Sequence, residues 1–320
     1  MNILITGSVA YDYLMSFPGS FKEHILEEEI ETLSLSFLVD SLTRRRGGVA
    51  ANIGYNLALL GVRAKVFATI GEDYKADRDL LTKKGVDTSD MHIISDAYTA
   101  SFFVTTDHSN SQIASFYPGA MAHAAELSLN NLDGFNPDLV VVSPNDPAAM
   151  VKYIEECKIL GWPYLYDPSQ QVARVDGETL KEGIEGAQAL FANAYEYEII
   201  KKKTGMSEAD ILDAVDFMAI THGEKGARVY HDDDLFEIPA VLTDRVVDPT
   251  GGGDAFRGGF LTGLSYDWDW EMCGKLGALA ATFCLESDCP QAHEYSKEDY
   301  VERFRQHFED NGKLDVLLSS

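Results

Sequence analysis

The feature that most restricts the fold of this 320-residue chain is a series of short apolar runs separated by helix-length segments. Each run is largely apolar rather than alternating with polar residues, which is typical of parallel strands buried on both faces. Between the runs, residues 50–61 and 147–161 space their apolar residues as helices do and end at a glycine. This alternation predicts an α/β fold with a doubly wound, mostly parallel sheet flanked by helices. The apolar runs occupy residues 2–7, 65–71, 138–143, 163–167, 189–193 and 217–223.

Two stretches interrupt the alternation of strands and helices. Residues 32–42 alternate apolar and polar side chains, the period of a strand with one solvated face, and residues 98–119 resemble two strands around the turn DHSNS. We expect both stretches to join a small β-sheet lid. A single layer of strands leaves an apolar face uncovered, so the lid could close over a ligand, pair with a second subunit, or do both. The expected division is a lid of residues 13–46 and 96–121 and a large α/β domain of residues 1–12, 47–95 and 122–320.

Charge and composition exclude several classes of protein. The formal net charge is −26, which argues against a nucleic-acid partner because phosphate backbones require basic faces. No apolar run approaches the roughly 18 residues of a membrane span, and the first residues lead directly into a strand rather than a signal peptide. The four cysteines have no metal-ligand spacing, as expected of reduced thiols. We therefore expect a cytoplasmic protein with no membrane partner.

The segment DPTGGGDAFRGGFL, residues 248–261, has three glycines followed by an acid at the start of a helical pattern. Gly251, Gly252 and Gly253 can bring backbone N–H groups close to a ligand, and the unpaired amides at a helix start attract an anion. Asp254 could be a helix-start acid that complements the dipole. It could instead be a general base that accepts a proton from an alcohol attacking a phosphoryl group held by these amides.

Two common nucleotide-binding motifs are missing. The sequence contains no G-x-x-x-x-G-K-[ST], so it is not that of a P-loop enzyme. No complete G-x-G-x-x-G follows the first strand, which argues against a dinucleotide-binding dehydrogenase.

The glycine–aspartate turn resembles the D-T-x-G-A-G-D signature of the ribokinase-like, pfkB-type carbohydrate and nucleoside kinases. Residues 46–61, RGGVAANIGYNLALLG, resemble the family's other signature, a glycine pair followed by asparagine and a helix. The two signatures stand in the family's order, and the resemblance covers nearly the whole chain. Segments such as IASFYPGAM and DPSQQVARVDGE are most similar to the bacterial adenosine kinases. One departure is Gly252, where the family usually has alanine.

The resemblance implies an acceptor site for a nucleoside. Asp12 would bind the sugar hydroxyls together with Asn52, and the sugar would lie against Gly47 and Gly48. Phe102 and Phe116 in the lid would hold the purine, with Phe37 as a possible further wall. Weaker polar candidates for the same site are Ser8, Ser36 and Gln171.

The resemblance also implies a site for ATP and Mg²⁺. Glu196 would organise Mg²⁺ through water, and Asn193 would lie near the phosphates. Arg257 could neutralise the donor phosphate or pair with Asp254, and Asp248 could belong to a K⁺ site or be structural. Contacts to the nucleotide are expected from Thr221, Gly223 and Gly226.

The resulting expectation is an ATP-dependent adenosine kinase that converts adenosine to AMP with release of ADP. Asp254 would be the base, and the amides of Gly251–Gly253 would hold the γ-phosphoryl group. The alternatives are a related kinase acting on a sugar such as ribose or fructose, one acting on another nucleoside, and a catalytically silent nucleotide-binding protein. The lid is also expected to form a homodimer.

Overall fold

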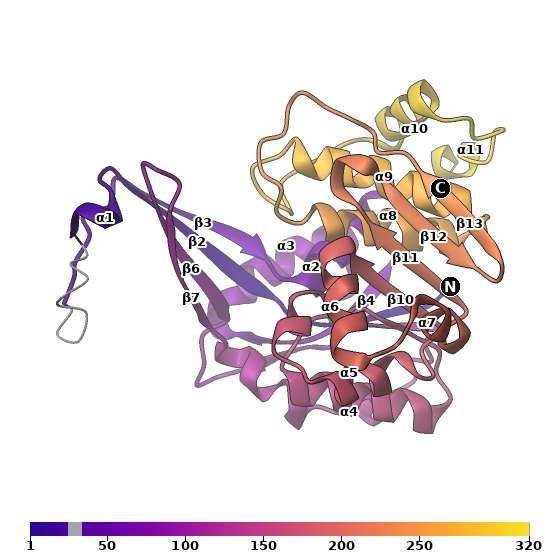
Figure 1. The fold of residues 1–320 in the computed structure, drawn as a ribbon, viewed down its shortest axis with the longest axis horizontal. Coiled ribbons are helices and arrows are strands. Elements are labelled where there is room, and N and C mark those ends of the chain that lie inside the picture. The colour runs from indigo at the N-terminus through magenta and orange to yellow at the C-terminus, as the bar shows by residue number, and fades with distance from the viewer. Residues whose placement is uncertain (25–33, 320) are drawn as a thin grey trace.

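The computed structural model describes residues 1–24 and 34–319, which form a large α/β body and a smaller sheet that projects from it (Figure 1). Among the described residues, the body contains one sheet of nine strands. The seven strands from β11 to β5 are parallel, while β12 and β13 form an antiparallel edge. Their spatial order is β13 (Asp234–Ile238), β12 (Ala227–His231), β11 (Phe217–Thr221), β10 (Ala189–Asn193), β9 (Tyr164–Tyr166), β8 (Leu139–Val142), β1 (Ile3–Thr6), β4 (Ala64–Gly71) and β5 (Met91–Ile94).

The order of the strands reverses at β1. From β1 the chain adds β4 and β5 on one side, and β8, β9, β10 and β11 on the other. In open α/β sheets such a reversal leaves a crevice at the carboxyl ends of the strands, where ligands bind. The fold therefore places the candidate site beyond the ends of β1 and β8.

Helices cover both faces of the large sheet (Figure 1). Ile5 packs against helices on one face, while its neighbour Leu4 packs against helices on the other, as the two-residue period of a strand requires. The uniformly apolar runs are thus buried on both faces. One face carries α2 (Val49–Leu59), α3 (Lys75–Lys84), α8 (Gly252–Ser265) and α9 (Trp270–Leu285), with α10 (Lys297–His307) and α11 (Asp315–Leu318) packed outside them. The other carries α4 (Pro147–Leu160), α5 (Gly177–Ile184), α6 (Ala194–Thr204) and α7 (Glu208–Ala214).

Two glycines inside α8 allow it to pack closely against its neighbours. A Cβ atom on Gly258 would lie 2.5 Å from the Cβ of Asn56 in α2. One on Gly259 would lie 2.5 Å from the carbonyl oxygen of Leu276 in α9. This close contact offsets the cost of about 1 kcal/mol that a glycine imposes inside a helix. It also fixes the amino end of α8 relative to α2.

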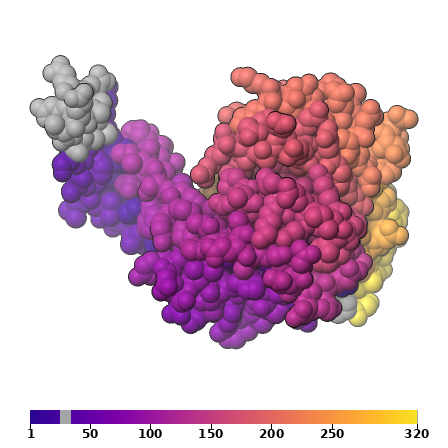
Figure 2. Space-filling view, turned by 90° about the horizontal axis from the view of Figure 1, so that it is seen from below, coloured from indigo at the N-terminus to yellow at the C-terminus, as the bar shows by residue number. Residues whose placement is uncertain are grey.

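The projecting sheet, called the lid below, has the strand order β3-β2-β6-β7. The second expected stretch does form two strands, β6 and β7, and the pairing places Phe102 opposite Phe116. Figure 2 shows the molecule hollowed between the lid and the body. The bounds are β2 (Ala10–Phe17), β3 (Ser41–Gly47), β6 (Ala100–Asp107) and β7 (Gln112–Tyr117), with the short helix α1 (Phe21–His24) following β2.

The strand expected at residues 32–42 is wrong for most of its length. Residues 34–40 form no strand, residues 32 and 33 lie outside the described part, and β3 begins only at Ser41. One apolar residue of the stretch, Phe37, packs against Phe17 and Phe21. The three arginines 44–46 lie in β3, where the register with β2 pairs them with residues 11–13.

Two further structural findings bear on the expectations from composition. No helix of the described residues is both long and apolar enough to cross a membrane. All four cysteines are free, buried thiols.

Candidate active site

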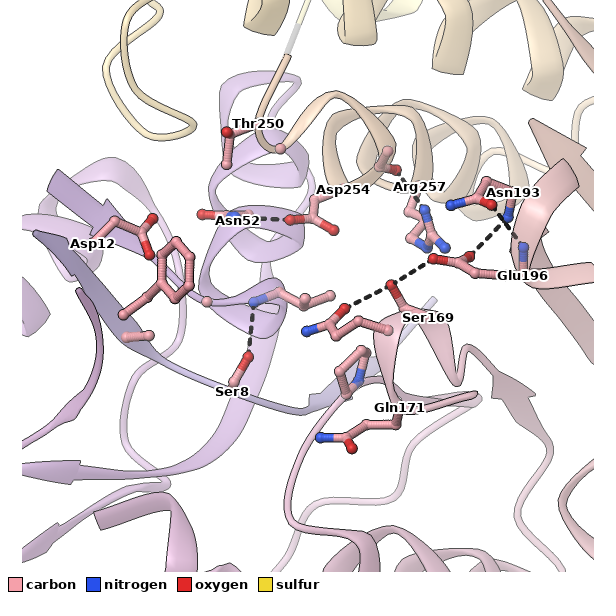
Figure 3. Close-up of a pocket in the computed structure, with 18 of the residues that line it drawn as sticks. Ser8, Asp12, Asn52, Ser169, Gln171, Asn193, Glu196, Thr250, Asp254 and Arg257 are labelled. Carbon is pink, nitrogen blue, oxygen red and sulfur yellow. Dashed lines mark hydrogen bonds between the residues drawn. The ribbon is translucent and has the colours of Figure 1, made fainter. Parts of the chain in front are cut away.

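A cavity of about 560 Å³ lies at the carboxyl ends of the parallel strands, between the body and the lid (Figure 3). The strand ends contribute Ser8, Asn193 and Thr221, and the lid contributes Asp12 with the facing pair Phe102 and Phe116. The amino end of α2 contributes Gly48 and Asn52, and that of α8 contributes Gly251, Gly253, Asp254 and Arg257. The structure therefore gathers most of the predicted site residues around one space.

The amino end of α8 combines free backbone amides with a carboxylate. Gly251 has a φ of 79°, the left-handed conformation that glycine adopts readily, and α8 begins at the next residue. In a helix the first N–H groups have no intrahelical acceptor, and no side chain among the described residues caps this helix. The helix dipole adds positive potential at the same point. Gly251 and Gly253 line the cavity, so their amides are the candidates for the predicted anion site. Gly252, the third glycine of that prediction, does not line this cavity, and its N–H donates to the carbonyl of Pro249 over 3.4 Å.

Asp254 lies in the first turn of α8 and accepts a hydrogen bond of 2.8 Å from the amide nitrogen of Asn52 (Figure 3). Burial raises the pKa of Asp254 to about 7, against the opposing effects of Arg257 and the Asn52 hydrogen bond. A carboxyl group with a pKa near neutrality can exchange a proton at physiological pH. This is the property required of a general base.

Arg257 forms its ion pair with Asp167. Pairing with Asp254 was one of the two roles expected for Arg257 from the sequence. Its Nη2 donates to Oδ1 of Asp167 over 2.7 Å, and its Nε approaches the other carboxylate oxygen. Its Nη1 donates to the carbonyl of Gly253 over 2.9 Å. Both charged side chains are buried. Arg257 therefore holds the glycine turn through the carbonyl of Gly253, and its charge adds positive potential at the turn.

Asn52 is held from its other side by Gln291, which follows α9. The Gln291 amide nitrogen donates to Oδ1 of Asn52 over 2.8 Å and lies 3.4 Å from the carbonyl of Gly47. Neither Gln291 nor Asp167 was among the predicted site residues. The sequence carries no local signal for them, because each meets its partner only after folding.

The glycine pair allows the lid strand β3 and helix α2 to meet beside the cavity. Gly48 has a φ of 92°, and a Cβ there would lie 2.6 Å from the carbonyl oxygen of Ser8. A Cβ on Gly47 would lie 2.6 Å from Oδ2 of Asp12. Glycine is thus required at position 48, where both the backbone conformation and the backbone of Ser8 exclude a side chain, whereas a side chain at position 47 would displace the Asp12 carboxylate. Ser8 itself accepts a hydrogen bond of 3.1 Å from the N–H of Val49, so its hydroxyl holds the start of α2.

Asp12 lies on β2 and presents its carboxylate to the cavity (Figure 3). Burial, with a smaller contribution from Asp248, raises its pKa to about 6, while Arg45 opposes the shift. Asp248 accepts hydrogen bonds from the Thr250 N–H over 2.8 Å and from Arg45 over 2.5 Å. Both of its oxygens are engaged, which favours the structural role over a K⁺ site.

Three further acceptor-site candidates have different positions. Gln171 lines the cavity, but its amide nitrogen donates to the carbonyl of Asn145 over 2.9 Å. Ser36 is exposed on the irregular segment before β3 and does not line the cavity. Phe37 packs away from it, in the aromatic cluster with Phe17 and Phe21. Neither Ser36 nor Phe37 lines the cavity in this structure, because residues 34–40 do not form the strand that their alternation indicates.

A second cavity of about 380 Å³ adjoins the first, and both are lined by Thr221 and Gly253. Gly223 and Gly226, which are predicted to contact the nucleotide, lie along this second cavity together with Gly252, which is predicted to hold the γ-phosphoryl group. Gly226 has a φ of 88°, and a Cβ there would lie 1.9 Å from the carbonyl of Ile238. The remaining wall contains many apolar residues that the sequence reasoning did not identify: Val241, Leu242, Val246, Ala278, Ala281 and Leu285 among them.

Asn193 and Glu196 form a capping box at the start of α6, each side chain accepting the backbone N–H of the other over 2.9 Å. One Glu196 oxygen also lies 3.4 Å from the hydroxyl of Ser169 (Figure 3). No group of three or more acidic, histidine or cysteine side chains in the described residues forms a ready metal site.

Two adjoining cavities that meet at the amino end of a helix beside a half-buried carboxylate, on this fold, define a ribokinase-like phosphotransferase. The pfkB family carbohydrate kinase profile matches residues 9–294, and the chain belongs to that family. The family predicted from the two signatures is therefore confirmed.

Known proteins similar to the chain include nucleoside kinases. A nucleoside kinase of Methanocaldococcus jannaschii is 30% identical over 95% of this chain and 97% of its own. The structure of a nucleoside kinase from Burkholderia thailandensis in complex with inosine is 38% identical, with a TM-score of 0.85 over 96% of this chain and 98% of that one. The same enzyme with ADP and inosine gives a TM-score of 0.83 over 96% of each chain.

Proposed function

We propose that the chain is an ATP-dependent nucleoside kinase that phosphorylates the 5′-hydroxyl of a purine nucleoside, with adenosine as the predicted substrate. The observation that carries the proposal is the meeting of the two cavities at the amino end of α8, where Gly253 lines both and Asp254 lies beside it. An acceptor in the first cavity and a phosphate donor in the second would bring their reacting atoms together at this point.

In the proposed reaction the 5′-oxygen attacks the γ-phosphorus of ATP and the bond from that phosphorus to the β,γ-bridging oxygen breaks, giving AMP and ADP. Asp254 accepts the hydroxyl proton, for which its pKa of about 7 is suited. The amides of Gly251 and Gly253 stabilise the charge of the phosphoryl group as it transfers. The buried Arg257–Asp167 pair keeps this turn in place and adds positive potential.

The donor nucleotide would occupy the second cavity. Its base would lie against the apolar wall formed by residues such as Val246 and Leu285, and its phosphates would extend past Thr221 toward Gly253. When bound, Mg²⁺ would neutralise charge on the phosphates, and Glu196 would orient its water ligands beside Asn193. Closure of the lid would exclude water from the transfer.

The lid supports a nucleoside over a free sugar as the acceptor. Phe102 and Phe116 face each other on neighbouring strands and both line the cavity, although Phe116 is 46% exposed. A purine provides a flat surface on which such rings stack, and a free sugar does not. Asp12 can accept hydrogen bonds from both ribose hydroxyls. The similarity of the chain to the nucleoside kinases of Methanocaldococcus jannaschii and Burkholderia thailandensis also supports a nucleoside as the acceptor.

A substrate panel tests the proposal. We expect kcat/KM for adenosine to exceed that for ribose and fructose by at least two orders of magnitude, since only the nucleoside gains the stacking contacts. Inosine and guanosine in the same panel test the choice of base. A preference for inosine would keep the nucleoside kinase and correct the base, whereas a preference for a free sugar would overturn the proposal.

We also propose that the lid forms a homodimer. Leu42, Ile113 and Tyr117 are large apolar side chains that the lid leaves exposed in this chain. Pairing with a second lid would cover such a face. Light scattering at micromolar concentrations should give twice the mass of 35.3 kDa, and a monomer across that range would contradict the dimer.

A further inference from the structure

A chain of side-chain hydrogen bonds leads to Asp254 from the junction of the lid with the body. It starts at the carbonyl of Gly47, the last residue of β3, which lies 3.4 Å from the amide nitrogen of Gln291. The same nitrogen donates to Oδ1 of Asn52 over 2.8 Å. Nδ2 of Asn52 in turn donates to Asp254 over 2.8 Å, the bond drawn in Figure 3. Gln291 is 1% exposed and Asn52 is 4% exposed, so water has little access to these amides.

The chain of contacts fixes which end of the Asn52 amide faces Asp254. A backbone carbonyl can only accept, so the Gln291 atom beside Gly47 is its NH₂ group. The same NH₂ group faces Asn52, which must present its oxygen there. The Asn52 NH₂ group is then turned toward Asp254. If the Asn52 amide were reversed, its NH₂ group would face the NH₂ group of Gln291. Its oxygen would then face the carboxylate of Asp254, and neither pair could form a hydrogen bond.

The segment that carries Gln291 is itself attached to the junction of β3 with α2. Arg46 donates from Nη2 to the carbonyl of Gln291 over 3.0 Å, and the thiol of Cys289 lies 3.4 Å from the carbonyl of Arg46. Residues 289–291 are thus docked on residues 46–47, where the lid strand enters the body. The position of Gln291 is determined by the same backbone that leads into the lid.

We propose that Gln291 is a positioning residue for the phosphoryl transfer: it locks the Asn52 amide so that a donor faces Asp254, and it ties that orientation to the β3–α2 junction. This inference rests on the proposed function only in taking Asp254 as the base. Without the Gln291 donor the Asn52 amide is free to reverse. Asp254 then loses a hydrogen bond that favours its charged form.

Several charged groups also face Asp254 and would be left unchanged by a substitution at Gln291. Arg257 on its own helix lowers the pKa of Asp254, while Asp167 after β9 and Glu196 on α6 raise it. On α9, burial and then the nearby carboxylate of Asp254 raise the pKa of the Cys284 thiol. A change seen on replacing Gln291 can therefore be assigned to the amide chain.

The variant Gln291→Met tests the proposal because methionine is similar in size and lacks the donor. The pH profile of kcat/KM should show its acid limb about one pH unit higher than in the parent enzyme. The loss should be about tenfold at pH 6 and should nearly vanish at pH 9, where Asp254 is ionised in both proteins. The control variant Gln188→Met makes the same change just before β10. Gln188 lies at the amino ends of the parallel strands, away from the site at their carboxyl ends, so this variant should leave the pH profile unchanged. A uniform loss at every pH, or an unmoved limb, would overturn the proposal.

Two further measurements separate this inference from the proposed function. In the background of Asn52→Ala, Gln291→Met should shift the limb no further, and an additive shift would contradict an action through Asn52. The carboxyl pKa can also be followed without turnover, by ¹³C NMR of aspartate-labelled protein with the Asp254 signal assigned from Asp254→Asn. A raised pKa in Gln291→Met supports the positioning role even if the substrate panel fails, and an unchanged pKa overturns it even if the panel succeeds.

Discussion

Replacing Asp167 by asparagine should destabilise the fold strongly, because it removes the carboxylate that forms the ion pair with the buried Arg257 charge. In the native protein the side chains of Arg257 and Asp167 are 6% and 0% exposed, so water cannot replace the lost carboxylate. Removal of one partner from a buried ion pair costs about 3–5 kcal/mol. Asparagine keeps one oxygen that can accept from Nη2, which favours the lower end, about 3 kcal/mol. Urea unfolding followed by circular dichroism measures the loss.

The control for this prediction is an exposed ion pair. Arg228 and Glu237 lie 3.1 Å apart on β12 and β13, with side chains 47% and 70% exposed. The variant Glu237→Gln should lower the unfolding free energy by no more than about 1 kcal/mol. If Asp167→Asn were no more destabilising than Glu237→Gln, the argument that the glycine turn is braced by a buried charge pair would be refuted.

Three further predictions concern the base, the lid and the packing of α8. In the parent enzyme kcat/KM should fall about tenfold per pH unit below pH 7, because Asp254 with a pKa of about 7 must be deprotonated to accept a proton; a flat profile from pH 5 to 8 would contradict this. Phe102→Ala should raise the KM for the nucleoside about tenfold, with no change in the KM for ATP, since one stacking surface is lost; equal changes in both would contradict it. Gly259→Ala should lower the unfolding free energy by about 1–2 kcal/mol, since the clash with the carbonyl of Leu276 exceeds the gain in helix propensity. A variant with a raised melting temperature would show that α9 can move away from α8 without this cost.

The large sheet could be predicted from sequence because its strands are buried on both faces. Residues 139–142, for example, are apolar throughout, and a strand in a parallel sheet covered by helices on both faces buries all four of these side chains. The glycine–aspartate turn was also predictable, because the left-handed conformation at Gly251 and the acid in the first turn are local properties of the sequence. Local rules are sufficient where neighbouring residues alone determine the structure.

The lid strand β3 and the network behind the base could not be predicted in this way. β3 carries three arginines that lie opposite residues 11–13 of β2, and Arg45 forms an ion pair with the distant Asp248. The alternation at residues 32–42 instead supplies Phe37 to an aromatic cluster. Such outcomes depend on long-range contacts that leave no local pattern.

The partners of the catalytic residues show the same limit. Asp167 and Arg257 are separated by 90 positions, and Gln291 and Asn52 by 239. Aspartate and glutamine occur in many loops, and only the folded chain shows which of them face another buried polar group. The residues predicted to contact the substrate can therefore be inferred from motifs, whereas the residues that hold them in place cannot.

The central claim is that Asp254 removes the proton of the acceptor alcohol, and Asp254→Asn tests it most directly. Asparagine has the same shape, and its side-chain oxygen can still accept the hydrogen bond from Asn52. We predict that turnover falls by about 10²–10⁴-fold while calorimetry gives a nucleoside Kd within about threefold of the parent value. Turnover within a few-fold of the parent enzyme, with binding intact, would contradict the account.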